Sequence, residues 1–313
     1  MTRRAATGFA RLLPVPVVIG ALVIAVAAVL AACGGGNGGS PQPTATVTVT
    51  ASPSASPSPS PSASPSLATT PVTLYFVRRG KLGVAERRGP QTTTPATVAI
   101  KALLKGPSVA ERAAGLSTDI PAGTRLNALA LAGGTATADF TSNFAQPAAN
   151  AVAARRVAET VYTLTQFPTV RRVVIKVGGR PLDQIASGGT GGSPDPLTIA
   201  SPLRRNEPWT SFEPTVFVES PGVGAVLTSP FILRGSASVF EGSFAVMLVD
   251  KSGRRIVRKQ VQASQGAPGR GRFRKTIPFS TSATEGTLIV YSVSMEDGSH
   301  QGEVRIPVTF AQD

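Results

Sequence analysis

The sequence is poor in three residue types that many functional sites require. Its 313 residues include one Cys, one His and 17 acidic residues against 31 Lys and Arg, which gives a formal net charge of +14. A disulfide-rich scaffold is excluded, because one Cys cannot form a bridge within the chain. A zinc site needs several His or Cys ligands, so we expect no metal and no other cofactor.

Motifs for nucleophilic and nucleotide chemistry are also missing. The nearest approach to a Gly-x-Ser-x-Gly elbow, residues 106–110, lacks the second glycine, and no phosphate-cradling loop occurs. His300 follows a turn at residues 297–299, where an exposed polar residue is commonplace. Four carboxylates leave glycan cleavage formally open: Asp119, Asp139, Glu159 and Glu241. The sequence therefore predicts a protein that is not an enzyme, with a cell-wall hydrolase as the alternative.

The N-terminus has the features of an export signal. Three arginines precede an uncharged apolar stretch over residues 12–30, and Leu30-Ala31-Ala32-Cys33 followed by Gly34 resembles a bacterial lipobox. An uncleaved membrane span is the alternative, because the stretch approaches spanning length. The position of the only Cys favours a signal peptide over residues 1–32 and a lipidated Cys33. We therefore expect an extracytoplasmic protein anchored to the cell membrane.

Composition divides the remainder of the chain. Residues 33–70 carry no charge and consist almost entirely of small residues, Pro and Thr, so they predict a disordered spacer that O-linked sugars could decorate. A second Gly- and Pro-rich stretch predicts a linker over residues 186–214. Two folded domains, residues 71–185 and 215–313, are the expected result.

Residues 71–185 alternate between strand and helix patterns in the order β-α-β-β-α-β. β-Branched and aromatic runs mark the strands, Thr94 and Pro95 start a helix that Gly106 and Pro107 end, and Gly133-Gly134 predicts a hairpin turn. A second helical period places Ala154, Val157, Val161 and Leu164 on one face. This order predicts two helices packed on one side of a small sheet, an α+β fold.

Residues 215–313 show only strand patterns. Seven short runs follow one another with turns at short intervals, over residues 215–219, 231–238, 244–250, 255–262, 273–279, 288–295 and 304–310. The expected fold is a two-sheet sandwich of the immunoglobulin-like type, without the paired Cys of antibody domains.

Both domains resemble known bacterial families. The first is similar to the GerMN domain of sporulation and spore-germination lipoproteins, on the motifs at residues 75–76, 102–107, 120–124, 138–140 and 164–168. The second is similar to the immunoglobulin-like domain that accompanies GerMN domains, on residues 220–221, 229–230, 235–242 and 296–299. The resemblance implies a fold like the ring-building motifs of envelope assemblies and supplies no catalytic residue. A role in sporulation or germination does not follow from the residues themselves.

Positive charge is concentrated in the first domain. Residues 71–185 hold 15 basic and 6 acidic residues, a net of +9, and eight of the arginines occur as four adjacent pairs. One pair is Arg87-Arg88, and the other three are the candidates for binding an anionic surface: Arg78, Arg79, Arg155, Arg156, Arg171 and Arg172. Such a domain would attract anionic lipid headgroups or phosphate-bearing wall polymers. A merely solvated basic surface is the simpler interpretation. Export makes nucleic acid an improbable partner.

Three classes of function remain after these exclusions. The first is a membrane-anchored module that binds envelope proteins or anionic wall polymers without chemistry. A cell-wall hydrolase or its activator is the second. The third is a solute-binding lipoprotein of a transporter, which an all-β second domain disfavours because such proteins close two α/β lobes on their ligand.

The lipobox generates a direct prediction. Metabolic labelling with a fatty-acid probe is expected to mark the wild-type protein and not Cys33→Ala, because the thiol is the acceptor of the lipid. Equal labelling of the two proteins would show that Cys33 is not modified.

Overall fold

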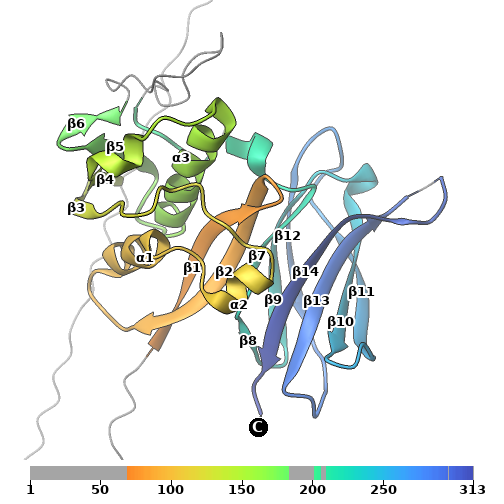
Figure 1. The fold of residues 1–313 in the computed structure, drawn as a ribbon. Coiled ribbons are helices and arrows are strands. Elements are labelled where there is room, and N and C mark those ends of the chain that lie inside the picture. Colours follow the sequence, from red (N-terminus) through yellow and green to blue (C-terminus); the bar gives the residue numbers. More distant parts are fainter. Residues whose placement is uncertain (1–68, 183–200, 206–208, 295, 313) are drawn as a thin grey trace, which may run out of the picture. The chain divides into compact units, whose positions relative to one another are not determined.

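The computed structural model describes residues 69–182, 201–205, 209–294 and 296–312. These residues belong to one compact unit, residues 63–313 (Figure 1). The expected signal peptide, Cys33, the spacer and much of the expected linker lie outside the described residues.

The first domain contains strands, two longer helices and short helical turns. Its elements are β1 (Thr69–Arg78), β2 (Lys81–Pro90), α1 (Pro95–Leu104), α2 (Val109–Ala113), β3 (Leu126–Ala132), β4 (Thr135–Phe140), η1 (Ser142–Ala145), α3 (Asn150–Leu164), β5 (Arg172–Val177) and β6 (Arg180–Pro181). The strands form two sheets, a β1–β2 hairpin and a sheet in the order β3-β4-β5-β6. The sequence pattern predicted one sheet, and in this respect the structure differs.

The hairpin partner of β1 was not predicted from the sequence. Strand β2 pairs with β1 in antiparallel register through a two-residue turn, in which Arg79 and Gly80 have φ of 50° and 73°. Positive φ at both central positions is typical of the tight turn that matches the twist of paired strands. The charged residues of β2 conceal its alternation, although Leu82, Val84 and Ala85 are buried.

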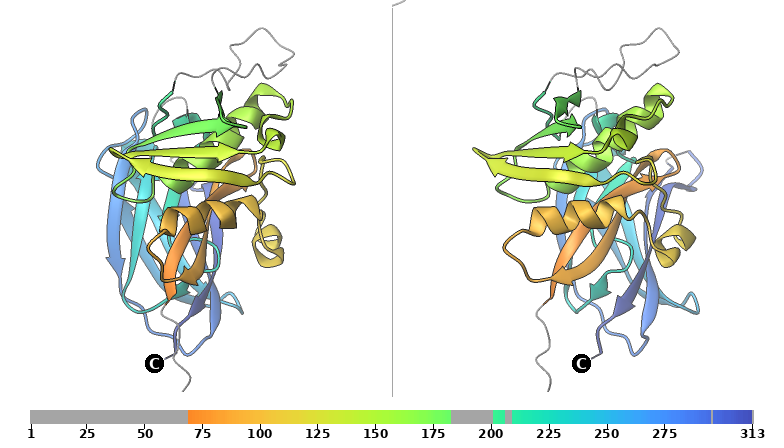
Figure 2. Two further views of the ribbon diagram at one scale, coloured as in Figure 1. Left: turned by 90° about the vertical axis from the view of Figure 1, so that its left-hand side faces the viewer. Right: turned by 60° about the vertical axis from the view of Figure 1, so that its left-hand side comes forward.

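Helix α1 begins and ends where the sequence predicted, whereas α3 ends at Leu164 and not at Phe167 as the pattern had indicated. Pro95 occupies the first turn of α1, and Gly106, with φ of 70°, follows its end. In α3, the four residues assigned to one face, Ala154, Val157, Val161 and Leu164, are all buried. Both helices contact β1 and each other, and strands β3 and β4 lie in front of α3 in Figure 2. The predicted α+β class is therefore confirmed.

The second domain consists of strands and two short helical turns. Its elements are η4 (Trp209–Phe212), β7 (Val216–Ser220), β8 (Val226–Leu227), β9 (Phe231–Ala237), η5 (Phe240–Gly242), β10 (Ser243–Asp250), β11 (Arg255–Gln262), β12 (Gly271–Ile277), β13 (Glu285–Val293) and β14 (His300–Phe310). All seven predicted strands are present, and the two-residue strand β8 is added. They form two sheets, in the orders β12-β9-β7 and β11-β10-β13-β14-β8.

Alternating burial along the strands explains why the two sheets pack together. In β9, Phe231, Leu233, Gly235 and Ala237 are buried, while the residues that alternate with them are exposed or half-buried. Phe244 of β10 and Phe273 of β12 place their rings 4.8 Å apart, which joins one sheet to the other. The interior is therefore the apolar layer of a sandwich, as the sequence predicted.

The two domains meet at the free edge of β2. Val223 forms a β-bridge with Ala85, in which its amide donates to Val84 at 2.9 Å and its carbonyl accepts from Glu86 at 2.8 Å. The preceding Gly222 allows this approach, because a Cβ there would lie 2.9 Å from the backbone of Ala85. The edge of the hairpin is thus covered by a segment of the sandwich domain.

A polar cluster extends this junction into the interior. The guanidinium of Arg205 lies between two aromatic rings, 4.8 Å from the centroid of Tyr75 and 4.4 Å from that of Tyr162. It also forms an ion pair with Glu219 on β7, which accepts a 3.0 Å hydrogen bond from the Tyr75 hydroxyl. Side chains from β1, α3 and β7 therefore meet on one cation, which we call the Arg205 cluster.

Part of the segment expected to be a linker is packed. Leu203 and Trp209 are buried, and Leu203 forms a β-bridge with Val173 of β5. Glu213 accepts a 2.5 Å hydrogen bond from the Tyr162 hydroxyl and lies 3.2 Å from Arg270. Composition alone did not indicate these contacts, because they depend on single residues within a Pro- and Gly-rich stretch.

The Arg205 cluster predicts a large cost for removing its cation. We expect Arg205→Ala to lower the free energy of unfolding by about 2–3 kcal/mol, because Glu219 loses its partner and two rings lose their contact. Urea unfolding measures the change. The neighbouring exposed Arg204→Ala is the control, expected to change stability by less than about 0.5 kcal/mol. Equal stability of the two variants would contradict the assigned role.

Candidate functional site

The structure separates the arginine pairs that the sequence singled out. Arg78 and Arg79 lie at the β1–β2 turn, Arg155 and Arg156 on α3, and Arg171 and Arg172 at the start of β5. The first pair lines a cavity that the other domain also lines. The three pairs therefore do not form one shared site.

The pair on α3 has a structural role instead of a surface role. Arg156 is only 2% exposed and donates hydrogen bonds to the carbonyls of Asp119, Phe144 and Gln146. Arg155 forms a 2.6 Å ion pair with Asp119. The expectation that Arg156 faces an anionic surface is wrong for this fold, because its donors hold the loops that flank α3.

The pair on β5 lies beside the β3–β4 turn. Arg172 donates a 3.0 Å hydrogen bond to the carbonyl of Gly133, whereas the side chain of Arg171 is exposed. Arg171 thus fits the expectation of a basic surface residue, and Arg172 is partly committed to the turn.

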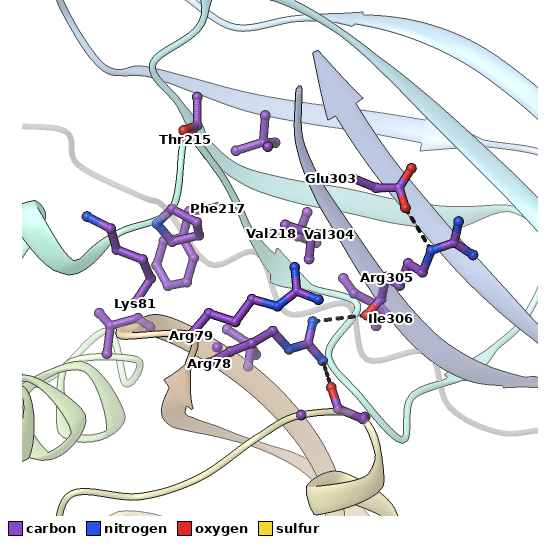
Figure 3. A pocket seen from close by; sticks show the side chains of 18 residues that line it. Arg78, Arg79, Lys81, Thr215, Phe217, Val218, Glu303, Val304, Arg305 and Ile306 are labelled. Carbon is purple, nitrogen blue, oxygen red and sulfur yellow. Dashed lines mark hydrogen bonds and ion pairs between the residues drawn. The ribbon is translucent and has the colours of Figure 1, made fainter. Parts of the chain in front are cut away.

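A cavity of about 500 Å³ lies between the β1–β2 turn and the sandwich domain (Figure 3). Four cationic side chains line this basic pocket: Arg78, Arg79, Lys81 and Arg305. Its one acidic lining residue, Glu303, already accepts a 2.7 Å hydrogen bond from Arg305 and lies 3.2 Å from His300. The wall between the charged groups is apolar and includes Val218, Val304 and Ile306.

Arg78 is the most enclosed of these cations. Its terminal nitrogens donate to the carbonyls of Arg305 at 2.9 Å and Ala114 at 2.7 Å. Its Nε is buried and has no hydrogen-bond partner. Burial lowers the pKa of Arg78, and the neighbouring charge of Arg79 lowers it further. Two like charges are therefore held close together in a partly desolvated recess.

Two residues of the basic pocket were missed in the sequence. Lys81 is the first residue of the unpredicted strand β2 and donates a 2.8 Å hydrogen bond to the carbonyl of Ser211. Arg305 lies on β14, more than 200 positions from Arg78 along the chain. The turn at Arg79-Gly80 could have indicated Lys81, but no local pattern could have indicated Arg305.

A second cavity, of about 800 Å³, also has charged lining residues, but these are largely paired. Arg87 forms an ion pair with Glu111, Lys251 with Glu285, and Asp250 with Arg254. Because these charges satisfy one another, the basic pocket is the better candidate for binding an ion.

The remaining candidates for chemistry are dispersed over the fold, and most of them are held in structural contacts. The His300 ring stacks on Tyr291 at 3.6 Å, and its Nδ1 lies 3.2 Å from Glu303. Within the described ranges, no three His, Cys, Asp or Glu side chains come together as a metal site would require. Asp139 accepts a hydrogen bond from the Gly179 amide at 2.9 Å, and Glu241 is exposed at a turn.

Glu159 is the one of these carboxyl groups that the fold buries completely. It accepts hydrogen bonds from the Thr118 hydroxyl at 2.6 Å and the Asp119 amide at 2.7 Å. Burial raises the pKa of Glu159 to about 8, and the two hydrogen bonds oppose this change only in part. Glu159 lies beneath the loop that Arg155 and Arg156 also hold, so it is a structural residue of that loop.

Comparison with known families defines the class of both domains. Residues 73–183 match the Germane family, described as sporulation and spore germination, and residues 215–299 match the Gmad2 family, described as the immunoglobulin-like domain of bacterial spore germination. The chain therefore carries a GerMN domain followed by a germination-type immunoglobulin-like domain. This confirms the resemblance of each domain.

Solved structures show weaker similarity. The tandem GerMN domains of the sporulation protein GerM from Bacillus subtilis share 21% identity over 69% of this chain and 63% of that chain, with a TM-score of 0.37. This chain thus spans less than two thirds of that protein. A putative lipoprotein from Clostridium perfringens shares 20% identity over 46% of this chain and 92% of that chain, with a TM-score of 0.30. No curated protein sequence matches the chain.

None of the helices in the part of the chain that the structure describes is long and apolar enough to cross a membrane.

The buried carboxyl of Glu159 predicts a dependence of stability on pH. The folded protein keeps its proton up to about pH 8, whereas the unfolded chain loses it near pH 4.5. The stabilisation is therefore complete below pH 4.5 and is lost as the pH rises through about 8. Glu159→Gln, whose amide keeps an acceptor and a donor, is expected to remove this part of the dependence.

Urea unfolding at intervals of about one pH unit between pH 5 and pH 9 measures this dependence of stability on pH. The exposed Glu241→Gln serves as the control and is expected to follow the wild type. Parallel stability curves for wild type and Glu159→Gln across this range would refute the assignment.

Proposed function

We propose that the protein is a non-catalytic binding module of the bacterial cell envelope. Lipid attached to Cys33 would tether it to the outer face of the cell membrane, and its GerMN domain would associate with anionic envelope components. The observation that carries the proposal is the uncompensated positive charge of that domain, 15 basic against 6 acidic residues over positions 71–185.

The arrangement of the acidic residues supports this proposal. Glu111 and Asp119 are engaged by Arg87 and Arg155, and Glu159 is buried with a raised pKa. These carboxylates cannot neutralise the exposed arginines Arg79 and Arg171. The electrostatic potential around the GerMN domain is therefore positive, and it attracts polyanions over about 10 Å at moderate salt.

The family of the domains is consistent with a role at the envelope. Both family descriptions refer to sporulation or spore germination. The proposal does not include a role in sporulation, because a basic surface supports binding to anions and does not identify a cellular process.

Salt dependence tests the proposal. Residues 33–313 with Cys33→Ser are expected to sediment with phosphatidylglycerol vesicles or purified cell wall at about 0.05 M salt and to be released at about 0.5 M, because salt screens exposed charges. Combined Arg79→Glu and Arg171→Glu substitution should weaken binding, since each basic residue near an anionic surface contributes about 1 kcal/mol.

Reversal of charge in the other domain provides the control. Arg258→Glu on β11 changes the net charge in the same direction at an exposed position of the sandwich. It is expected to reduce binding less than either substitution in the GerMN domain. Binding that is insensitive to salt, or absent, would contradict an electrostatic role.

A further inference from the structure

We propose that the basic pocket is a binding site for a phosphate ester of a polyol or sugar. The inference rests on the proposed function and goes further, because it assigns one site and one ligand chemistry to the envelope association. Four observations carry it: the balance of charge, the fixed guanidinium of Arg78, the position of Arg79 and the apolar wall.

The charges that line the basic pocket favour an anion. Arg78, Arg79 and Lys81 converge from one hairpin, and no carboxylate in the described part of the chain forms an ion pair with any of them. Glu303 is already held by Arg305 and His300. A single carboxylate ligand would leave most of this charge unbalanced. A phosphate group offers more charge and more acceptor oxygens, directed toward several donors at once.

Arg78 supplies a guanidinium that is already in position. Its two bonds to the carbonyls of Arg305 and Ala114 fix the guanidinium plane between the two domains. The Nε–H that remains is buried without a partner, which is costly for a charged group. The positive charge of this guanidinium is therefore only partly compensated, and it adds to the positive potential that an anion in the pocket would meet.

Arg79 supplies the second guanidinium, and its side chain is exposed. The backbone of Arg79 is in the left-handed region, with φ of 50°, as the tight turn requires. The side chain of Arg79 extends beside that of Arg78 toward β14 (Figure 3). No hydrogen bond or ion pair engages that side chain among the described residues. The planar fork of Arg79 can therefore bind two oxygens of one phosphate.

The size and wall of the basic pocket favour an ester over inorganic phosphate. About 500 Å³ is within the range of sites for small organic molecules. Val218, Val304 and Ile306 offer apolar contact to the carbon part of such a ligand. We therefore assign a soluble or polymeric polyol phosphate as the ligand.

Calorimetric titration tests the assignment. Residues 33–313 with Cys33→Ser are titrated with glycerol 3-phosphate, inorganic phosphate and glycerol. We expect glycerol 3-phosphate to bind most tightly and glycerol not to bind. Arg79→Asn should weaken the ester about tenfold, as loss of a charge-assisted pair would. Asn tolerates the left-handed backbone at this turn, so the variant is expected to fold.

Two further variants separate specific recognition from general charge. Arg171→Asn removes the same charge outside the pocket and is expected to change binding less than about twofold. Arg79→Lys keeps the charge but loses the fork, and it is expected to bind more weakly than wild type. Equal losses for Arg79→Asn and Arg171→Asn, or no loss for Arg79→Lys, would overturn the pocket assignment.

The outcomes also distinguish this inference from the proposed function. Salt-sensitive binding to vesicles or wall without any binding of glycerol 3-phosphate would overturn the phosphate site and leave the envelope function standing. Tight binding of inorganic phosphate and ester alike would overturn the role of the apolar wall. Absence of binding to the vesicles, the cell wall and the three small molecules alike would overturn both proposals.

Discussion

The Arg205 cation between Tyr75 and Tyr162 is the interaction on which the relation of the two domains depends. The rings belong to β1 and α3, and the carboxylate that neutralises the cation belongs to β7. Arg205 is half-buried, and a charge taken partly out of water is stabilised only where such partners surround it. Because the partners come from both domains, their contacts with Arg205 join one domain to the other. The Gly222–Val223 segment then adds backbone hydrogen bonds at the edge of β2.

The basic pocket is a consequence of this junction. Once β2 and β7 are brought together, the β1–β2 turn lies against β14, and Arg78 donates to the carbonyl of Arg305 across the two domains. Cations of the two domains then share one recess, although each domain alone would expose them separately to water. Association of the domains thus places several cationic side chains around one cavity. This cavity is the candidate site for the envelope binding that we propose.

Several parts of the fold could be predicted because their signals are local. The apolar period of α3, the Gly133-Gly134 turn and the alternation of β9 each lie within a few residues, and the structure agrees with all three. Strand β2 was missed because Glu86, Arg87 and Arg88 conceal its pattern. The site was predicted less well. Adjacent arginines read alike in a sequence, yet Arg156 is buried among carbonyls and Arg79 is exposed.

The sequence by itself determined the class of each domain, the concentration of positive charge in the first domain and the position of the single Cys. Net charge is a sum over the residues of a segment, and the helix and strand patterns are periodicities of its apolar residues. Both depend only on the order of residues along the covalent chain. Only the tertiary structure decided which arginines face solvent, that Arg205 and Trp209 are packed, and that Arg305 joins Arg78 at one pocket. Those outcomes depend on contacts between residues distant in sequence, since burial and the pairing of charges arise only when the domains pack.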